Sequence, residues 1–338
     1  MYVDVALDSI ITYAITVGAS DIHFDPILNG IQVRLRIDGL LTEYMLVDAT
    51  DADMLVNRIK VFSGMDISEK RLPQDGRWEW SVKSYAVTMR VSSLPSLYGE
   101  AIVCRLMGNE GVHKNLLELG MDVELQEKIA ALLKRPYGLI TICGPTGSGK
   151  TATLYAMLRM LNLKETKLIC LEDPVEATIE GAIQIGINEK IGFTFSKGLR
   201  TVLRQDPDSI MIGEIRDNET AQLAVKAALT GHRVITTVHT NTALGVIGRL
   251  VDMGVEPYLL HATLIGSLSQ RLVRRIDSTT HSYQGRLGLF EYLEIPFSGI
   301  DWDHVEQYMF TSLQDSAHLA INSGITTLEE VHRAGILL

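Results

Sequence analysis

The chain has 338 residues, of which 46% are hydrophobic and 21% charged, a balance that supports folded cores and excludes a disordered chain. Lys and Arg number 31 against 41 Asp and Glu, so the formal net charge is −10, which argues against a protein whose average charge attracts nucleic acid or an anionic membrane. Cys104, Cys143 and Cys170 form no CxxC pair, so the sequence predicts neither a disulfide framework nor a Cys-rich zinc module.

Two further features of the sequence indicate in which cell compartment the protein lies. No run of about 18 apolar residues marks a membrane span. The acidic start of the chain, MYVDVALDSII, lacks the basic residues with which a signal peptide begins. We therefore expect a cytoplasmic protein, and its length favours two domains over one small core.

Residues 1–107 have the pattern of a small α+β domain. Apolar residues at helical spacing near the N-terminus predict an amphipathic helix. Residues 31–37 alternate like a strand, and Asp38-Gly39 predicts the tight turn of a hairpin. A helical segment near 51–63 follows, and the domain ends in three strand-like runs, RWEWSVK, YAVTMRV and AIVCRLM.

The second half changes character after the polar, glycine-containing segment 108–115, which we predict to be a linker. Over residues 116–338 short apolar runs alternate with longer helical patterns, the arrangement of βαβ units around a mostly parallel sheet. The predicted fold class is therefore α/β, with the smaller α+β domain in front. The runs that predict strands of the sheet are LITIC (139–143), KLICL (167–171), SIMIG (209–213) and RVITTV (233–238).

The segment GPTGSGKT (144–151) matches the phosphate-binding P-loop pattern G-x-x-x-x-G-K-[ST] in full, between an apolar strand and a good helix. Glycines allow backbone N–H groups to turn toward phosphate oxygens, and the helix N-terminus adds its dipole. Lys150 would reach the β- and γ-phosphates of ATP, and the Thr151 hydroxyl would ligate Mg²⁺. The predicted nucleotide-binding residues are Gly144, Pro145, Thr146, Gly147, Ser148, Gly149, Lys150 and Thr151.

Polar side chains follow the next three predicted strands where each one ends. Glu172 and Asp173 follow KLICL, Glu214 follows SIMIG, and His239 follows RVITTV. Ligands of open α/β sheets bind beyond the carboxyl ends of the strands, so we expect these groups beside the P-loop. A single carboxylate at such a place is usually a helix cap or a surface group, but three such ends behind a P-loop favour a nucleotide site. A structural role for His239, and turn chemistry for Asp173 before Pro174, stay open as alternatives.

These motifs, in this order, resemble those of the secretion-type ATPases of type II secretion, type IV pilus and competence systems, from ASDIH (19–23) to near residue 330. In that family three boxes follow the P-loop, and LEDPVE (171–176), IMIGEIRD (210–217) and TGHRVITTVHTNTA (230–243) are similar to them. The resemblance implies a PAS-like N-terminal domain, a RecA-like motor domain and a hexameric ring.

The resemblance also implies a role for single residues. Glu172 would activate the attacking water, Glu214 would support Mg²⁺ together with Thr151, and His239 would sense the γ-phosphate. Hydrolysis needs an oriented water and neutralised phosphate charge, which agrees with these implied roles.

The segment MRVSSLPSLYGEAIVCRLM (89–107) is similar to the part of the family that carries two phosphate-contacting arginines. Arg90 and Arg105 occupy their places, which implies that the first domain closes onto the nucleotide and couples its motion to hydrolysis. Without the resemblance, two arginines on strands would be interpreted as surface ion-pair partners.

Within the family, the chain is closer to the assembly and secretion ATPases than to the retraction ATPases. It has GEIRD where the retraction branch has GEMRD, and it lacks the AIRNL motif of that branch. We also expect it to lack the extra N-terminal docking domain of the secretion type, and its three scattered cysteines do not form that type's four-cysteine zinc module. This compact form resembles the ComGA-type competence ATPase of Gram-positive bacteria.

The function that this resemblance implies is a cytoplasmic motor, peripheral on the inner face of the cell membrane, that assembles a competence pilus for DNA uptake. It would use ATP and Mg²⁺, without zinc. Its implied partners are further copies in a homo-hexamer and a polytopic membrane platform protein, with no direct nucleic acid contact. The alternatives are a type IV pilus or type II secretion load, a retraction motor, a nucleic-acid translocase and a non-catalytic ring scaffold.

Overall fold

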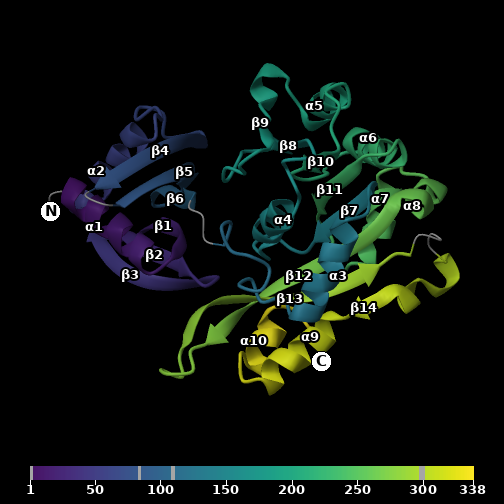
Figure 1. Cartoon of the computed structure of the whole chain (residues 1–338). Helices are drawn as coiled ribbons and strands as arrows, with labels where there is room; N and C mark the ends of the chain where they lie inside the picture. The colour runs from purple at the N-terminus through teal and green to yellow at the C-terminus, as the bar shows by residue number, and fades with distance from the viewer. Residues whose placement is uncertain (1–2, 83–84, 108–110, 297–300) are drawn as a thin grey trace. The chain divides into compact units, whose positions relative to one another are not determined.

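The computed structural model describes four stretches of the chain, residues 3–82, 85–107, 111–296 and 301–338. The chain divides into two compact units, residues 1–110 and 111–338, each with a sheet of its own (Figure 1). The division lies within the segment for which the sequence predicts a linker.

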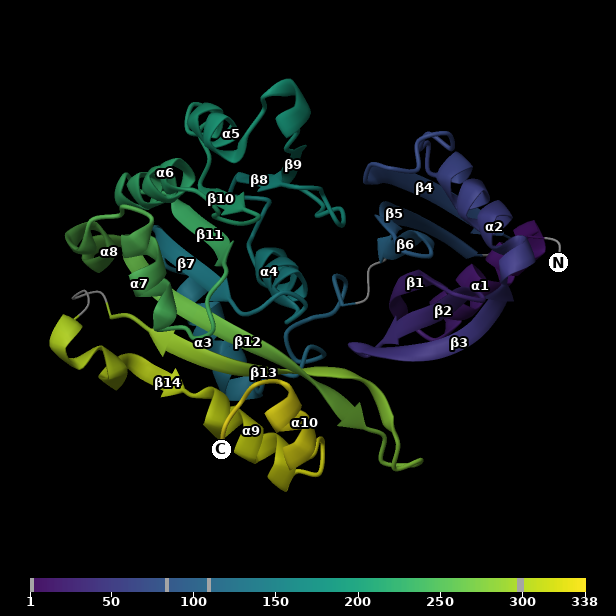
Figure 2. The ribbon, with the colours of Figure 1, turned by 180° about the vertical axis from the view of Figure 1, so that it is seen from behind.

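The first unit is a six-stranded sheet with helices packed on one face. In chain order its described elements are α1 (Val3–Thr16), β1 (Ala19–Ile27), β2 (Gly30–Ile37), β3 (Leu40–Asp48), α2 (Ala49–Phe62), β4 (Gln74–Val82), β5 (Tyr85–Ser96) and β6 (Gly99–Met107). The strands lie in the order β3-β2-β1-β6-β5-β4, and each paired neighbour is antiparallel. Both helices share a single apolar core with the sheet, and the ribbon of this unit is drawn from two opposite sides in Figures 1 and 2.

The amphipathic helix, the hairpin, the second helix and the three last strands of this unit agree with the elements predicted from the sequence. The sequence pattern does not predict β1, although this strand lies in the middle of the sheet between β2 and β6. Only Ile22 and Phe24 are fully buried among the central residues of β1, while the alternating His23 and Asp25 are partly exposed. Its apolar signal is therefore too short for periodicity to detect.

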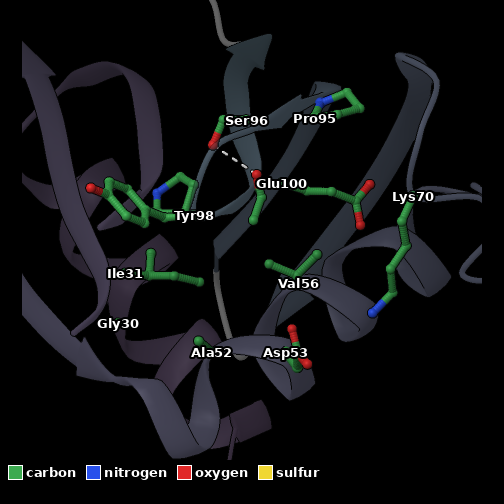
Figure 3. A pocket seen from close by; sticks show the side chains of 12 residues that line it. Gly30, Ile31, Ala52, Asp53, Val56, Lys70, Pro95, Ser96, Tyr98 and Glu100 are labelled. Atoms are coloured by element: carbon green, nitrogen blue, oxygen red, sulfur yellow. Dashed lines mark hydrogen bonds between the residues drawn. The ribbon is translucent and has the colours of Figure 1, made fainter. Parts of the chain in front are cut away.

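A buried ion pair joins α2 of the first unit to the last two strands. The Lys60 side chain is fully buried, and its Nζ lies 2.7 Å from Glu100 Oε1, which also accepts a 2.9 Å hydrogen bond from Ser93 Oγ. Lys60 Nζ donates a second bond of 2.7 Å to the carbonyl oxygen of Glu69. Glu100 and Lys70 also line a cavity of about 140 Å³ (Figure 3). Removal of either charge of the pair would leave the other one buried without its partner.

The second unit is an eight-stranded sheet with helices on both faces. In chain order its described elements are α3 (Val123–Leu133), β7 (Gly138–Cys143), α4 (Lys150–Arg159), β8 (Leu168–Glu172), β9 (Ile183–Gly186), η1 (Glu189–Ile191), α5 (Phe195–Val202), β10 (Ser209–Ile212), α6 (Asn218–Leu229), β11 (Arg233–Val238), α7 (Gly245–Asp252), α8 (Pro257–Thr263), β12 (Leu264–Ile276), β13 (Tyr283–Glu294), η2 (Trp302–Tyr308), β14 (Met309–Thr311), α9 (Leu313–Asn322) and α10 (Leu328–Arg333). The strand order is β14-β13-β12-β7-β11-β10-β8-β9. Neighbours from β12 to β9 are parallel, and β13 and β14 add antiparallel pairs at one edge.

Two apolar cores lie on the two faces of this sheet. One contains residues of α5, α6, α7 and α8, and the other contains residues of α3 and α4. Successive residues of one strand enter different cores, as Leu139 and Ile140 do in β7. Burial on both faces explains the continuous apolar runs, and the four strands predicted from them, with the α/β class, are confirmed.

The long hairpin of β12 and β13 is not predicted by the sequence pattern. β12 carries polar side chains that are buried, among them Ser269, Gln270 and Arg271, so its apolar run is interrupted. The C-terminal helices pack against this hairpin, where the nearly buried Glu330 carboxylate accepts hydrogen bonds from Arg274 and Arg333. The hairpin thus joins the centre of the sheet to the end of the described chain.

Candidate active site

The candidate site lies at the carboxyl edge of four adjacent parallel strands. β7 is paired with β11, β11 with β10, and β10 with β8, all in parallel. The P-loop follows β7, His239 follows β11, Glu214 follows the end of β10, and Glu172 ends β8. The expectation that these segments share one edge of the sheet is confirmed.

The P-loop has a backbone that requires glycine. Gly144 has φ +146°, and a Cβ there would lie 2.5 Å from Ser148 Oγ and 2.6 Å from the carbonyl oxygen of Gln270. Gly149, with φ +86°, occupies the N-cap of α4 in the left-handed conformation that other residues rarely adopt. The loop therefore wraps closely around the start of the helix, where backbone N–H groups and the helix dipole favour an anion.

Polar groups of the loop fit a polyphosphate. Lys150 Nζ donates to the carbonyl oxygens of Gly144 and Pro145 at 2.8 and 3.0 Å, and burial lowers the pKa of Lys150. Ser148 Oγ is buried and has no hydrogen-bond partner within the described residues. A cradle that excludes side chains, with a lysine and an unused hydroxyl, is suited to phosphate oxygens. Thr151 begins α4 directly after Lys150.

Glu214 and His239, predicted from two separate motifs, are brought into contact. His239 Nε2 lies 3.3 Å from Glu214 Oε2, and the Glu214 side chain is only 16% exposed. Arg216, which the motif assignment did not single out, is paired with Glu214 Oε1 at 2.5 Å, and this bond raises the pKa of Arg216. Thr237 Oγ1 donates a 2.6 Å bond to the carbonyl of Gly213, which holds the ends of the two strands together.

Glu172 lies in a different environment, enclosed rather than open. It is 4% exposed, and its Oε2 accepts a hydrogen bond from the hydroxyl of Tyr155 while its Oε1 accepts one of 3.0 Å from Gln184 Nε2. Burial raises the pKa of Glu172, and the bonds from Tyr155 and Gln184 act in the opposite direction. No motif of the sequence identifies Tyr155 or Gln184, because each is an ordinary residue of an apolar helix or strand.

The loop that follows His239 is held by the β12–β13 hairpin. An Arg271 guanidinium nitrogen donates to the Asn241 carbonyl at 2.7 Å, and Glu291 Oε1 accepts a 2.5 Å bond from the Ala243 amide. Burial raises the pKa of Glu291, and that of Arg271 is lowered by the same cause. The strands that the sequence pattern did not predict therefore hold the segment that carries His239.

Arg90 and Arg105 lie in the first unit, directly opposite each other on β5 and β6. Arg105 Nε donates a 2.8 Å bond to Asp21 Oδ1, and the Arg105 side chain is 63% exposed. Two like charges facing each other across strands are unfavourable by themselves. For Arg105, the pairing with Asp21 is the ion-pair alternative considered above. Contact of Arg90 and Arg105 with phosphate stays a prediction.

Three features of the described residues concern a metal site, a disulfide and a membrane-spanning helix. Within residues 3–82, 85–107, 111–296 and 301–338, no group of three or more His, Cys, Asp or Glu side chains is arranged to hold a metal ion. Cys104, Cys143 and Cys170 are buried thiols without a disulfide. In the part of the chain that the structure describes, no helix is long and apolar enough to cross a membrane.

Comparison of the sequence with protein families finds a match to the family described as "Type II/IV secretion system protein" over residues 2–333. The type II secretion system protein E of Klebsiella pneumoniae is 49% identical over 270 residues, which are 80% of this chain and 54% of that protein. The type II secretion system ATPase E of Vibrio cholerae is 40% identical over 372 residues, with 97% of this chain and 74% of that protein covered. The chain thus spans about half the length of the first of these relatives.

Two solved structures are similar over nearly their whole length. The ATPase DotB of Legionella pneumophila superposes with a TM-score of 0.76 at 23% identity, covering 98% of this chain and 96% of that one, and shows the fold. The pilus retraction motor PilT, solved with bound ADP, gives a TM-score of 0.67 at 27% identity, covering 96% and 95%.

Proposed function

Because the chain belongs to the family of type II/IV secretion system proteins, we propose that it is an ATP-hydrolysing motor of an assembly machine of that class. The observation that carries the proposal is the arrangement of the P-loop, the Glu214–His239 pair and the enclosed Glu172 at one edge of the sheet. Transfer of a phosphoryl group to water needs positioning and charge from the protein rather than covalent chemistry, and this edge offers both. ADP in the related PilT structure supports an adenine nucleotide as the ligand.

Each part of the site has a distinct task in this proposal. Backbone amides of residues 144–149 and the Lys150 ammonium hold the phosphate oxygens. Thr151 and Glu214 would hold Mg²⁺, and the bound ion would neutralise phosphate charge. Glu172 orients the attacking water and accepts its proton, and burial raises the pKa of this carboxylate, which makes it a stronger base.

His239 and the two arginines respond to charge on the reacting phosphate. Since Glu214 Oε2 lies 3.3 Å from the Nε2 of His239, it holds the orientation of the imidazole ring. Arg90 and Arg105 provide positive charge from the first unit, and Arg105 would exchange its bond with Asp21 for a phosphate oxygen. Such an exchange would couple movement of the first unit to the state of the nucleotide.

For the load, we propose a pilus-like fibre driven by a homo-hexamer that docks on a polytopic membrane platform protein at the cytoplasmic face of the membrane. The competence assignment is supported by the short connection between β12 and β13, where the secretion type carries its four-cysteine module. The names of the relatives favour type II secretion instead. In a strain that lacks the gene, loss of DNA uptake with normal protein secretion supports competence, and the reverse result supports secretion.

ATP hydrolysis by the purified full chain tests the motor activity. Glu172→Gln is expected to lower kcat by about 100-fold or more while ATP binding is retained, because only the base is lost. Lys150→Ala is expected to lose ATP binding. Glu180→Gln, which changes an exposed glutamate of the same unit, is the matched control and should behave as wild type.

Two results would contradict the proposal. Unchanged turnover in Glu172→Gln would remove the assigned role of that carboxylate. Hydrolysis that requires DNA, with binding that weakens steeply as salt rises, would support a nucleic-acid translocase instead of a pilus motor.

A further inference from the structure

The environment of Glu172 contains two side chains that the motifs do not explain. Tyr155 lies on α4, the helix that begins at the P-loop lysine, and it is 1% exposed. Gln184 lies on β9, the neighbour of β8 at the edge of the sheet. One contact comes from the P-loop helix and the other from the sheet, so Glu172 is held from two elements.

The hydrogen bonds of Tyr155 determine the direction in which its hydroxyl donates. Its oxygen accepts bonds from the backbone amides of Glu176 and Ala177, at 3.2 and 3.3 Å. Amides only donate, and a hydroxyl has a single proton, so that proton is directed at Glu172 Oε2. Tyr155 therefore ties the carboxylate to the loop that follows it.

The hydrogen bonds of Gln184 determine the orientation of its amide. Its Oε1 accepts a 2.8 Å bond from the Ile179 amide, which places Nε2 toward the carboxylate. Nε2 donates to Glu172 Oε1 at 3.0 Å and to the carbonyl of Ala177 at 2.8 Å. A flipped amide would lose all three bonds, so one orientation is strongly favoured.

We propose that Tyr155 and Gln184 are positioning residues for the water-activating carboxylate, a role that rests on the proposed ATPase function. Each donates a hydrogen bond to a different oxygen of Glu172, and the two bonds together restrict rotation of the carboxylate. Fixed orientation of a base lowers the barrier by maintaining the attack geometry. Tyr155 lies on the helix that begins at Lys150. One helix therefore carries both the phosphate-binding lysine and the tyrosine that orients Glu172.

The experiment uses the full-length protein and the variants Tyr155→Phe and Gln184→Met, which keep the size of each side chain and remove its hydrogen bonds. We expect kcat to fall by about tenfold or more and the KM for ATP to change by less than about twofold. In Tyr155→Phe the acidic limb of the plot of kcat against pH should move to higher pH, because the hydrogen bond from the Tyr155 hydroxyl lowers the pKa of Glu172 in the wild type. A residue that serves packing alone would not move that limb.

Tyr292→Phe is the matched control. Tyr292 is a fully buried tyrosine of the same unit whose hydroxyl has no hydrogen-bond partner among the described residues. Loss of this hydroxyl removes no bond, so kcat, KM and the pH profile should match those of wild type.

A double-variant cycle with Glu172→Gln distinguishes this inference from the proposed function. If Tyr155 acts through Glu172, Tyr155→Phe should lower kcat by less than about twofold in the Glu172→Gln background. The thermal midpoints, measured without ATP, should likewise be non-additive in the two variants. Additive effects on kcat and on the midpoint, with active wild type, overturn the positioning role alone. Absence of any hydrolysis by wild type overturns the proposed function and this role with it, even where the midpoints show coupling.

Discussion

Replacement of Lys60 by Met is expected to destabilise the first unit strongly. The side chain of Lys60 is 0% exposed and that of Glu100 is 5% exposed, so the substitution leaves a buried carboxylate that keeps only the bond from Ser93. Loss of one partner of a buried pair typically costs about 3–5 kcal/mol of unfolding free energy. For a unit of this size, that corresponds to a fall in melting temperature on the order of 20 °C.

Chemical unfolding followed by tryptophan fluorescence measures this effect in the intact chain. Trp78 and Trp80 are buried in the core of the first unit, so their emission reports its unfolding. We expect the fluorescence midpoint of Lys60→Met to move to lower denaturant. Lys70→Met, which changes an exposed lysine of the same unit, is the control and should stay within about 0.5 kcal/mol of wild type.

The double variant Lys60→Met, Glu100→Gln provides the decisive comparison. It removes both charges, so most of the loss should be regained, since an uncharged pair needs no counter-ion. If Lys60→Met lowers the unfolding free energy by less than about 1 kcal/mol, the reasoning is refuted, because a buried Glu100 carboxylate without its partner would then cost little. The reasoning is also refuted if the double variant loses as much unfolding free energy as the two single variants lose together.

Two further predictions concern the second unit. Burial raises the pKa of Glu330, but hydrogen bonds from Arg274 and Arg333 outweigh it and hold that pKa at about 2, below the ordinary 4.5. The stabilisation is therefore fully present above about pH 4.5 and lost as the pH falls toward 2, so Glu330→Gln should cost about 3 kcal/mol at pH 7 and converge with wild type in acid unfolding curves. Gly144→Ala should abolish ATP binding in calorimetric titration, because its Cβ would collide with Ser148 Oγ and the Gln270 carbonyl, and undiminished affinity would contradict this steric argument.

The nucleotide cradle was predictable because its chemistry is local. Glycines at fixed spacing, a lysine and a following helix define the loop within eight residues, and the backbone angles of Gly144 and Gly149 agree with that interpretation. Strands β7, β8, β10 and β11 were equally predictable, since burial on both faces makes each a continuous apolar run. Glu214 and His239 could be placed at one sheet edge for the same reason, although their contact at 3.3 Å could not.

Two of the strands that escaped prediction, β1 and β12, have a clear physical cause. β1 has few buried apolar residues, and β12 buries polar groups whose partners lie elsewhere in the chain. Sequence periodicity detects buried apolar residues. It does not detect a serine or an arginine that is buried because a distant backbone carbonyl accepts its hydrogen bond. Arg271 is such a residue, since it is held by Asn241, 30 residues earlier.

By itself, the sequence determined that this chain carries a P-loop on an α/β sheet, that acidic and imidazole groups follow the neighbouring strands, and that its motifs resemble those of secretion-type ATPases. Only the tertiary structure determined which groups hold Glu172. Tyr155 lies 17 residues before it and Gln184 lies 12 residues after it, on elements that meet the carboxylate only when helix and sheet pack. A motif records residues that are close along the chain, whereas the pKa and orientation of a buried base depend on residues that packing brings close in space.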